Sequence, residues 1–346
     1  MPFRIIRNDI TRVTADAIVN TANPHATIGS GTDSAIYQAA GMEELLRARK
    51  AIGDIRPGDV QETPAFRLHA RYILHTVGPV WIDGHHHERE ILRSCYDRCL
   101  QLAKHLSCQS IAFPLISTGS YGFPRDEALQ IALDAFQRFL LKDDMDITLV
   151  VFQRSSLVLS QRLQEEIESF IDDFEVQRLT QEEYGTASPP LRRVRQLRIQ
   201  EAAECQSPAP DAVPEASEEM PDDLDSVIAS AGPTFQQRLF QLIDARGLDD
   251  VDVYKAANID RKVFSKIRCN AHYQPSKPTA VAFCIALRLS MEEMMDLLSR
   301  AGLAFSPSNR FDLIIRFFVG RGIYDMLTIN AALFKYDQPC LGPYSE

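Results

Sequence analysis

The chain has 346 residues, a hydrophobic fraction of 45% and a formal net charge of −10. These values are typical of globular protein with a sizeable core, and the length favours two folded units over one. No apolar run approaches the roughly 20 residues that cross a bilayer, and the charged start "MPFRIIRNDI" does not resemble a signal peptide, so we expect a cytoplasmic protein.

The charge is distributed unevenly along the chain. Residues 201–225 contain nine acidic residues and no basic one, so this segment alone carries −9 and the remainder is nearly neutral. The overall pI therefore says little about what either folded part binds. The seven cysteines are scattered without any CxxC pair, which is typical of reduced thiols.

Strand and helix patterns alternate up to about residue 175. Short apolar or β-branched runs of the kind found in buried parallel strands occupy 17–20, 72–77, 110–117 and 147–152. Amphipathic helical patterns occupy 33–50, 88–106, 124–141 and 156–171. This alternation predicts an α/β sandwich around a mainly parallel sheet in a first domain, residues 1–175.

The pattern then changes twice. Residues 176–232 are rich in proline and acid, which predicts a flexible linker, with one basic insert at 191–200. Residues 233–346 are predicted to form an all-helical domain. Its helical patterns occupy 234–247, 250–258, 260–268, 277–289, 291–302, 308–319 and 322–335. Asp260 and Ser290 occupy N-cap positions, and Gly247 and Gly302 stand where helices are expected to stop.

Two loops of small residues follow predicted strands and precede predicted helices. The stretch "NTANPHATIGSGTDSAIY" (20–37) follows the strand at 17–20, and "STGSYGFP" (117–124) follows the strand at 110–117. Glycine and serine let backbone amides approach an anion closely, and a helix N-terminus favours negative charge. Either loop alone is weak evidence, since a plain turn is an equally good interpretation. Together they favour a cradle for a diphosphate at the carboxyl ends of the strands.

Four motifs in order resemble the macrodomain, an ADP-ribose-binding α/β/α fold. These are "NDITRVTADAIVNTAN", "GTDSAIYQAAG", "YILHTVGPVW" and "IAFPLISTGSYGFP". The spacing of Asn20, Asn23 and Asp33 resembles the MacroD-like hydrolase branch. The resemblance covers about residues 1–175. It implies a three-layer α/β/α sandwich with a mixed, mainly parallel sheet, and it implies that the chain binds ADP-ribose.

The resemblance also implies roles for individual residues. Asp9 would accept a hydrogen bond from the adenine amino group beside the Ile10 amide, and Phe152 would pack against adenine. Asn23 would hold the distal ribose, and Asp33 would orient or activate the attacking water, so that these two are the candidate catalytic residues. The loops around the diphosphate and distal ribose would be formed by Gly29, Ser30, Gly31, Ser117, Thr118, Gly119, Ser120, Tyr121 and Gly122.

The chemistry of these residues gives the roles a physical basis, but it also allows structural roles for Asp33 and Asn20. Ester cleavage needs no metal or other cofactor if water is held beside the ribose, with a carboxylate and the substrate's phosphate as bases. From its position alone, Asp33 is equally well placed to cap the following helix, and Asn20 is interpreted as structural. The chain departs from the branch at Ser30, Thr32 and Tyr37, the last in place of a common histidine, which bears on turnover more than on binding.

The three histidines at 85–87 do not predict a metal site. Three adjacent side chains cannot all reach one tetrahedral ion from a regular backbone, and no further ligand stands at the required spacing. We therefore expect a solvated loop there and no bound metal.

The short connection between the helices at 250–258 and 260–268 resembles a helix-turn-helix of the Cro/repressor type. The second of these helices would display Arg261, Lys262, Lys266 and Arg268. Residues 254–288 carry seven basic side chains and one acidic, which suits a phosphate backbone. A protein-docking module is the alternative, because helix-turn-helix geometry is also a common packing unit.

These observations predict a bacterial hydrolase that removes mono-ADP-ribose from acidic protein side chains, and from esters such as O-acetyl-ADP-ribose. Its helical domain would bind a nucleic-acid or protein target. The alternatives are a non-catalytic reader of ADP-ribose and a DNA-binding regulator whose first domain senses a nucleotide.

Overall fold

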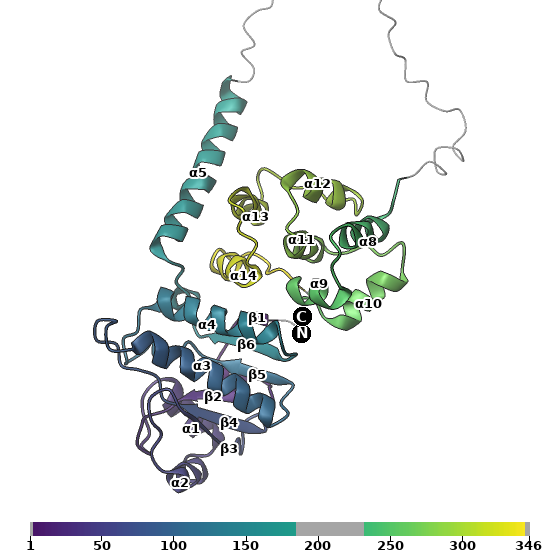
Figure 1. Ribbon diagram of the computed structural model, residues 1–346. Helices are drawn as coiled ribbons and strands as arrows, with labels where there is room; N and C mark the ends of the chain where they lie inside the picture. Colours follow the sequence, from purple (N-terminus) through teal and green to yellow (C-terminus); the bar gives the residue numbers. More distant parts are fainter. Residues whose placement is uncertain (1–2, 185–231, 343–346) are drawn as a thin grey trace, which may run out of the picture. The chain divides into compact units, whose positions relative to one another are not determined.

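A computed structural model describes residues 3–184 and 232–342 (Figure 1). The described residues 3–168 and 234–342 form one compact unit, and residues 169–184 belong to a second. The basic insert at 191–200 and the acidic run at 201–225 lie outside the described residues. Within the described ranges, no helix is long and apolar enough to cross a membrane.

The first part of the chain is built on a six-stranded sheet with the strand order β1-β6-β5-β2-β4-β3. The strands are β1 (Phe3–Arg7), β2 (Ala17–Thr21), β3 (Val60–Pro64), β4 (Tyr72–Thr76), β5 (Ser110–Phe113) and β6 (Asp146–Val151). All neighbouring pairs are parallel except β3 with β4. The predicted mixed, mainly parallel sheet is confirmed.

Both faces of the sheet are covered by helices (Figure 1). The covering helices are α1 (Thr32–Ala40), α2 (Met42–Ile52), α3 (Glu88–His105) and α4 (Arg125–Leu140). Ile18 and Ile73 of the sheet pack with Ile36 of α1 and Leu45 of α2 in one core cluster. On the other face, the Phe113 ring of β5 contacts Tyr96 of α3 and Phe136 of α4. The alternation of strand side chains thus supplies two apolar layers.

Several elements differ from the sequence prediction. The single helix expected at 33–50 is two helices, because Gly41 has φ 106°, a conformation that favours glycine and turns the chain. The edge strands β1 and β3 were not predicted, because β1 carries charges and β3, VQETP, exposes polar residues. Helix α5 (Gln161–Tyr184) continues past residue 176, where the linker was expected to begin.

The region after Pro233 is entirely helical where it is described, as predicted. It contains α8 (Phe235–Ala245), α9 (Asp250–Ala256), α10 (Arg261–Cys269), α11 (Lys277–Ala286), α12 (Met291–Ser299), α13 (Arg310–Gly320) and α14 (Met326–Lys335). The side chains of Asp260 and Ser290 accept backbone N–H bonds at the starts of α10 and α12. Gly247 and Gly302 have positive φ, which confirms both predicted helix stops.

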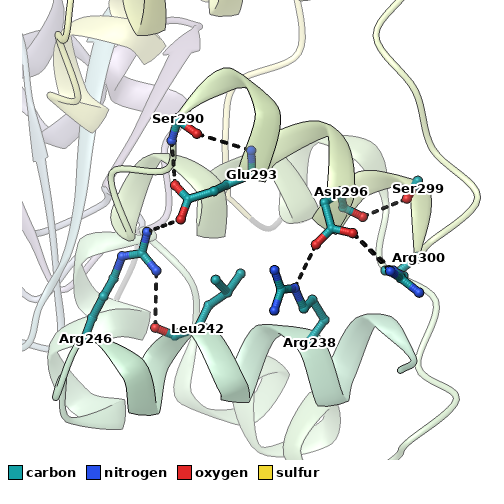
Figure 2. A network of polar contacts seen from close by, with 8 residues as sticks. All are labelled: Arg238, Leu242, Arg246, Ser290, Glu293, Asp296, Ser299 and Arg300. Atoms are coloured by element: carbon teal, nitrogen blue, oxygen red, sulfur yellow. Dashed lines mark hydrogen bonds and ion pairs between the residues drawn. The ribbon is translucent and has the colours of Figure 1, made fainter. Parts of the chain in front are cut away.

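Figure 2 shows how α8 and α12 are joined by polar contacts. Arg238 Nε donates to Asp296 Oδ2 at 2.7 Å, and Arg246 Nη2 donates to Glu293 Oε1 at 2.8 Å. Glu293 also accepts the backbone N–H of Ser290, which completes a capping box. The Glu293 carboxylate therefore caps α12 and also binds the arginine that ends α8.

Within the first compact unit, Asn258 connects the helical region to strand β1. Its Oδ1 accepts the Phe3 N–H at 2.6 Å, and its Nδ2 donates to Phe3 O at 2.9 Å. Nδ2 also lies 3.3 Å from the carbonyl of Leu341, near the end of the described chain. Leu341 and most apolar residues of α14 are buried, so this last segment completes a core.

Candidate functional site

Two cavities adjoin at the carboxyl ends of the parallel strands. The first measures about 260 Å³ and lies between the loop after β2 and the loop after β5. The second measures about 340 Å³ and extends toward β1 and β6. Both are lined by Gly31 and Thr32, so the start of α1 separates them. This is the edge where ligands bind in open α/β sheets.

The structure brings almost all of the predicted ADP-ribose residues to these cavities. The first is lined by Asn23, Gly29, Ser30, Gly31, Asp33, Ser117, Thr118, Gly119, Ser120 and Tyr121. The second is lined by Asp9, Ile10 and Phe152. Gly122 lines neither cavity, and its N–H donates to Gly119 O within its own turn at 3.0 Å. The four basic residues predicted to contact nucleic acid lie on α10 and line neither cavity.

Asp33 is a buried carboxylate, 2% exposed, on the first turn of α1. Its Oδ1 accepts a hydrogen bond from Asn20 Nδ2 at 2.6 Å, and its Oδ2 accepts the Gly29 N–H at 2.5 Å. Neither contact caps α1, whose N-cap Gly31 has no side-chain cap. Burial raises the pKa of Asp33, and the two hydrogen bonds and the Arg49 charge oppose that rise. The carboxylate thus fixes the loop that lines the first cavity.

Asn20 belongs to a buried polar chain beneath the cavity. Its Nδ2 lies 3.1 Å from Nδ1 of His75, whose Nε2 lies 2.9 Å from Thr63 Oγ1. Burial lowers the pKa of His75 to about 3, so the ring is neutral. Since Asn20 donates to Nδ1, we assign the ring proton to Nε2, from which it is donated to Thr63. This supports the structural interpretation of Asn20.

Asn23 lies beside Asp33 at the wall of the same cavity. Its Nδ2 is 3.2 Å from both the carbonyl and Oγ1 of Thr27, and its Oδ1 is 3.5 Å from the Tyr121 hydroxyl. A Cβ added at Gly29 would lie 3.1 Å from Asp33 Oδ2 and 3.2 Å from Asn23 Nδ2. Glycine therefore lets this backbone pass between the two side chains that the resemblance assigns to catalysis.

Ser117 is a strained residue at the start of the second loop. Its φ is 64°, an uncommon value for a residue with a side chain, and its buried Oγ has no hydrogen-bond partner within the described residues. A Cβ at Gly78 would collide with this hydroxyl. Gly78 lines the cavity but was not predicted, although it lies in the quoted motif "YILHTVGPVW".

The second cavity offers an apolar face and one carboxylate. Phe152 is 71% exposed directly after β6 and lines this cavity. Asp9 Oδ1 accepts from both the N–H and the hydroxyl of Thr11, at 2.9 and 2.8 Å. The short helix Ile10–Arg12 thereby holds this carboxylate at the cavity wall. A planar base with an amino group fits these two groups.

Two further unpredicted residues and the three departures from the MacroD-like branch also bear on the site. Arg125, the first residue of α4, and Ser156 line the first cavity; Arg125 directly follows the predicted loop and is the only basic residue among the lining residues described. Tyr37 lines neither cavity. It is buried in the core cluster beneath α1, where burial raises its pKa to about 12. Ser30 and Thr32 remain at the first cavity.

The histidine run at 85–87 does not come together at one point. His86, Asp83 and Glu88 are close enough to share an ion, but Glu88 accepts backbone N–H bonds from Ile82, Gly84 and His86. These bonds explain why the Glu88 carboxylate is buried there: it holds the turn before α3 in place. His87 lies apart from this group, with φ 60°, at the start of α3.

Comparisons with known proteins find relatives of the first part of the chain. The Macro domain family model matches residues 19–132. A macro domain-containing protein of Chlorobaculum tepidum is 46% identical over 147 residues, which is 42% of this chain and 84% of the relative. An O-acetyl-ADP-ribose deacetylase of Citrobacter rodentium is 42% identical over 166 residues, 46% of this chain and 94% of the relative. A solved Oceanobacillus iheyensis macrodomain with MES bound is 38% identical, covers 48% of this chain and 92% of that one, and has a TM-score of 0.44.

The sheet, the two cavities and the sequence matches to these relatives define the class of protein. The chain belongs to the Macro domain family.

Proposed function

We propose that this chain binds ADP-ribose across the two adjoining cavities and hydrolyses mono-ADP-ribose from acidic protein side chains, together with esters such as O-acetyl-ADP-ribose. This proposal rests on how the side chains are divided between the cavities. Asn23 and Asp33 line one cavity, Asp9 and Phe152 line the other, and Gly31 lines both. This order of groups matches a ligand with a base at one end, a diphosphate in the middle and a ribose at the other.

The proposed chemistry is attack of water on an ester of the distal ribose. Asn23 would hold ribose hydroxyls through a neutral amide, which does not repel the diphosphate. Asp33 accepts the Gly29 N–H and so fixes the loop beside the ligand, and it would act on water with the help of the substrate's phosphate. The relatives named O-acetyl-ADP-ribose deacetylase support an ester as the bond that is cleaved.

Two measurements test this proposal. Calorimetry with ADP-ribose tests binding, and incubation with a glutamate-ADP-ribosylated peptide or O-acetyl-ADP-ribose tests hydrolysis. We expect Asn23→Ala and Asp33→Ala to lose at least about 10²-fold in turnover. Asp244→Ala, an exposed change on α8, serves as the control. Full activity in both site variants would contradict the assignment, and absence of ADP-ribose binding by the wild-type chain would contradict the whole proposal.

A non-catalytic reader is the competing function for the same cavities. Both oxygens of Asp33 already accept hydrogen bonds, which is what a purely structural carboxylate would also do. In a reader, Asp33→Ala would weaken ADP-ribose binding, and the wild-type chain would release no product from either ester.

A nucleic-acid partner for the helical region is a second proposal, and it would make the chain a regulator that senses a nucleotide. On α10, Arg261, Lys262 and Lys266 are exposed and form no ion pair within the described residues. The positive charge is smaller than the residue count implies, because Lys255, Arg268 and Lys277 pair with carboxylates from outside residues 254–288. A mobility shift at low salt that is lost in Lys262→Ala/Lys266→Ala supports this partner; no shift at low salt contradicts it and favours protein docking.

A further inference from the structure

Arg49 is a buried cation under the loop that follows β2. It lies on the last turn of α2 and is 1% exposed, although arginine is almost never fully buried without partners. It lines neither cavity, and the sequence did not single it out. Its burial therefore needs an explanation in the surrounding contacts.

The guanidinium binds backbone carbonyls from two separate segments. It donates to Gly53 O, at the end of its own helix, and through Nη2 to Asn23 O at 3.2 Å and Pro24 O at 3.3 Å. Pro24 O also accepts the Ile55 N–H at 2.9 Å. A planar fork of donors is suited to several fixed acceptors at once, which a lysine ammonium on a flexible stem holds less well. Arg49 thus joins the end of α2 to the residue whose side chain enters the first cavity.

The positive charge of Arg49 also acts on the site. Arg49 lowers the pKa of Asp33, against the effect of burial. The other titratable groups that interact with this pair are Tyr37 on α1, Tyr121 on the loop after β5, Asp54 after α2 and neutral His75 of β4. A diphosphate would enter beside a buried carboxylate, so a buried positive charge offsets the repulsion.

We propose that Arg49 is a positioning residue of this site, which holds the backbone of Asn23 and Pro24 in place and balances the charge of Asp33 when an anionic ligand enters. It acts through Asn23 and Asp33 and does not itself touch the ligand. The inference rests on the proposed function for its ligand. The hold of Arg49 on the Asn23 and Pro24 carbonyls, here called the clamp, and the charge balance with Asp33 are properties of the free protein.

The test compares three variants of the full chain. Arg49→Met removes the charge at similar length, Arg49→Lys keeps the charge but loses the fork, and Arg47→Met is a matched control on the exposed face of the same helix. Two measurements need no ligand: hydrogen exchange of the Gly29 amide, and the titration of the Asp33 carboxyl followed by carbon NMR. Calorimetry with ADP-ribose and the separate values of kcat and KM report on function.

For Arg49→Met we expect Gly29 exchange at least about tenfold faster, a higher Asp33 titration midpoint and at least about tenfold weaker ADP-ribose binding, a factor that corresponds to about 1.4 kcal/mol. Arg49→Lys should keep the Asp33 midpoint near that of the wild type while losing protection at Gly29. Arg47→Met should match the wild type in every measurement. If Arg49→Met does not fold, the Arg49→Lys results decide the clamp.

Wild-type Gly29 exchange in Arg49→Lys, or wild-type exchange, Asp33 midpoint and ADP-ribose affinity in Arg49→Met, would overturn the inference. A wild-type chain that binds no ADP-ribose would overturn the proposed function instead. In that case the exchange and titration results still decide whether Arg49 holds this loop.

Discussion

At the scale of single residues, the site depends on charges and amides that hold one another. Asp33 accepts bonds from Asn20 and from the Gly29 amide, and Arg49 binds the carbonyls of Asn23 and Pro24. The cavity wall is thus fixed mainly by groups beneath it. Changes at Asn20 or Arg49, which line neither cavity, should therefore alter ligand binding without removing a group that touches the ligand.

The ionisation of Asp33 predicts the pH dependence of turnover. Because burial raises the pKa of Asp33 above its ordinary value of 3.8, the carboxylate should take up a proton at a higher pH than an exposed aspartate. Protonation removes its ability to accept both bonds and to act on water. We expect kcat to fall as pH decreases through this raised pKa, measured as a pH–rate profile with O-acetyl-ADP-ribose.

The matched variant for this profile is Asp33→Asn, which cannot titrate. Its residual turnover should not show that acidic limb. An acidic limb of the same midpoint in the variant would assign the ionisation to another group.

Substitution of Gly29 tests the close approach of the loop to both candidate catalytic side chains. In Gly29→Ala the new methyl group would lie 3.1 Å from Asp33 Oδ2 and 3.2 Å from Asn23 Nδ2, tighter than ordinary contact. We expect ADP-ribose affinity to fall about tenfold, or about 1.4 kcal/mol by calorimetry. Gly320→Ala is the control, since a Cβ there meets nothing within 4 Å. Equal affinities in the two variants would show that the loop moves aside freely.

At the scale of elements, several helices are held by side chains at their ends. Glu293 is an example, because it accepts the Ser290 N–H and pairs with Arg246 of α8. We expect Glu293→Ala to reduce local stability by about 1 kcal/mol, measured as faster hydrogen exchange of α12 amides. Glu293→Gln keeps an acceptor for the cap but loses the charge, so its effect should be smaller.

The same carboxylate gives this contact an acidic pH dependence. The Ser290 N–H and Arg246 lower the pKa of Glu293 below its ordinary value of 4.5. A lowered pKa in the folded state contributes stability above the unfolded value, and this contribution is lost as pH falls through the folded value. The difference in α12 protection between wild type and Glu293→Gln should therefore shrink below about pH 4.5. A difference that is constant with pH would contradict the role of the charge.

At the scale of the whole molecule, Asn258 has the most consequential contacts between distant parts of the chain. It binds both backbone groups of Phe3, and its φ of 56° is one that asparagine adopts more readily than most residues. Asn258→Ala would leave the Phe3 N–H and carbonyl buried without these partners. We expect a loss of roughly 2–4 kcal/mol in the protection of β1 amides by hydrogen exchange.

Asn258→Gly separates the two contributions, because it removes the bonds but relieves the strain of positive φ. The glycine variant should lose somewhat less protection than the alanine variant. Wild-type protection of β1 in Asn258→Ala would show that these bonds do not hold the strand.

The sequence by itself determined the sheet strands 17–20, 72–77 and 147–152, the helix caps at Asp260 and Ser290, and the motif loops that line the two cavities. Those features depend on local pattern, on turn chemistry and on motifs that lie within single loops. Of the lining residues, Gly78, Arg125 and Ser156 were not predicted. The charged edge strand β1, the polar edge strand β3 and the break at Gly41 were missed, because an edge strand needs no continuous apolar run and a glycine in a helical pattern is tolerated.

Only the tertiary structure decided what Asp33, Arg49 and Asn258 do. The bonds of Asp33 reach back 13 residues to Asn20, those of Arg49 reach 26 residues to Asn23, and those of Asn258 reach 255 residues to Phe3. Burial gives these polar groups their importance, since a buried donor, acceptor or charge must find a partner inside the protein. No local pattern reveals which residues become buried together, so this part of the site followed from the fold.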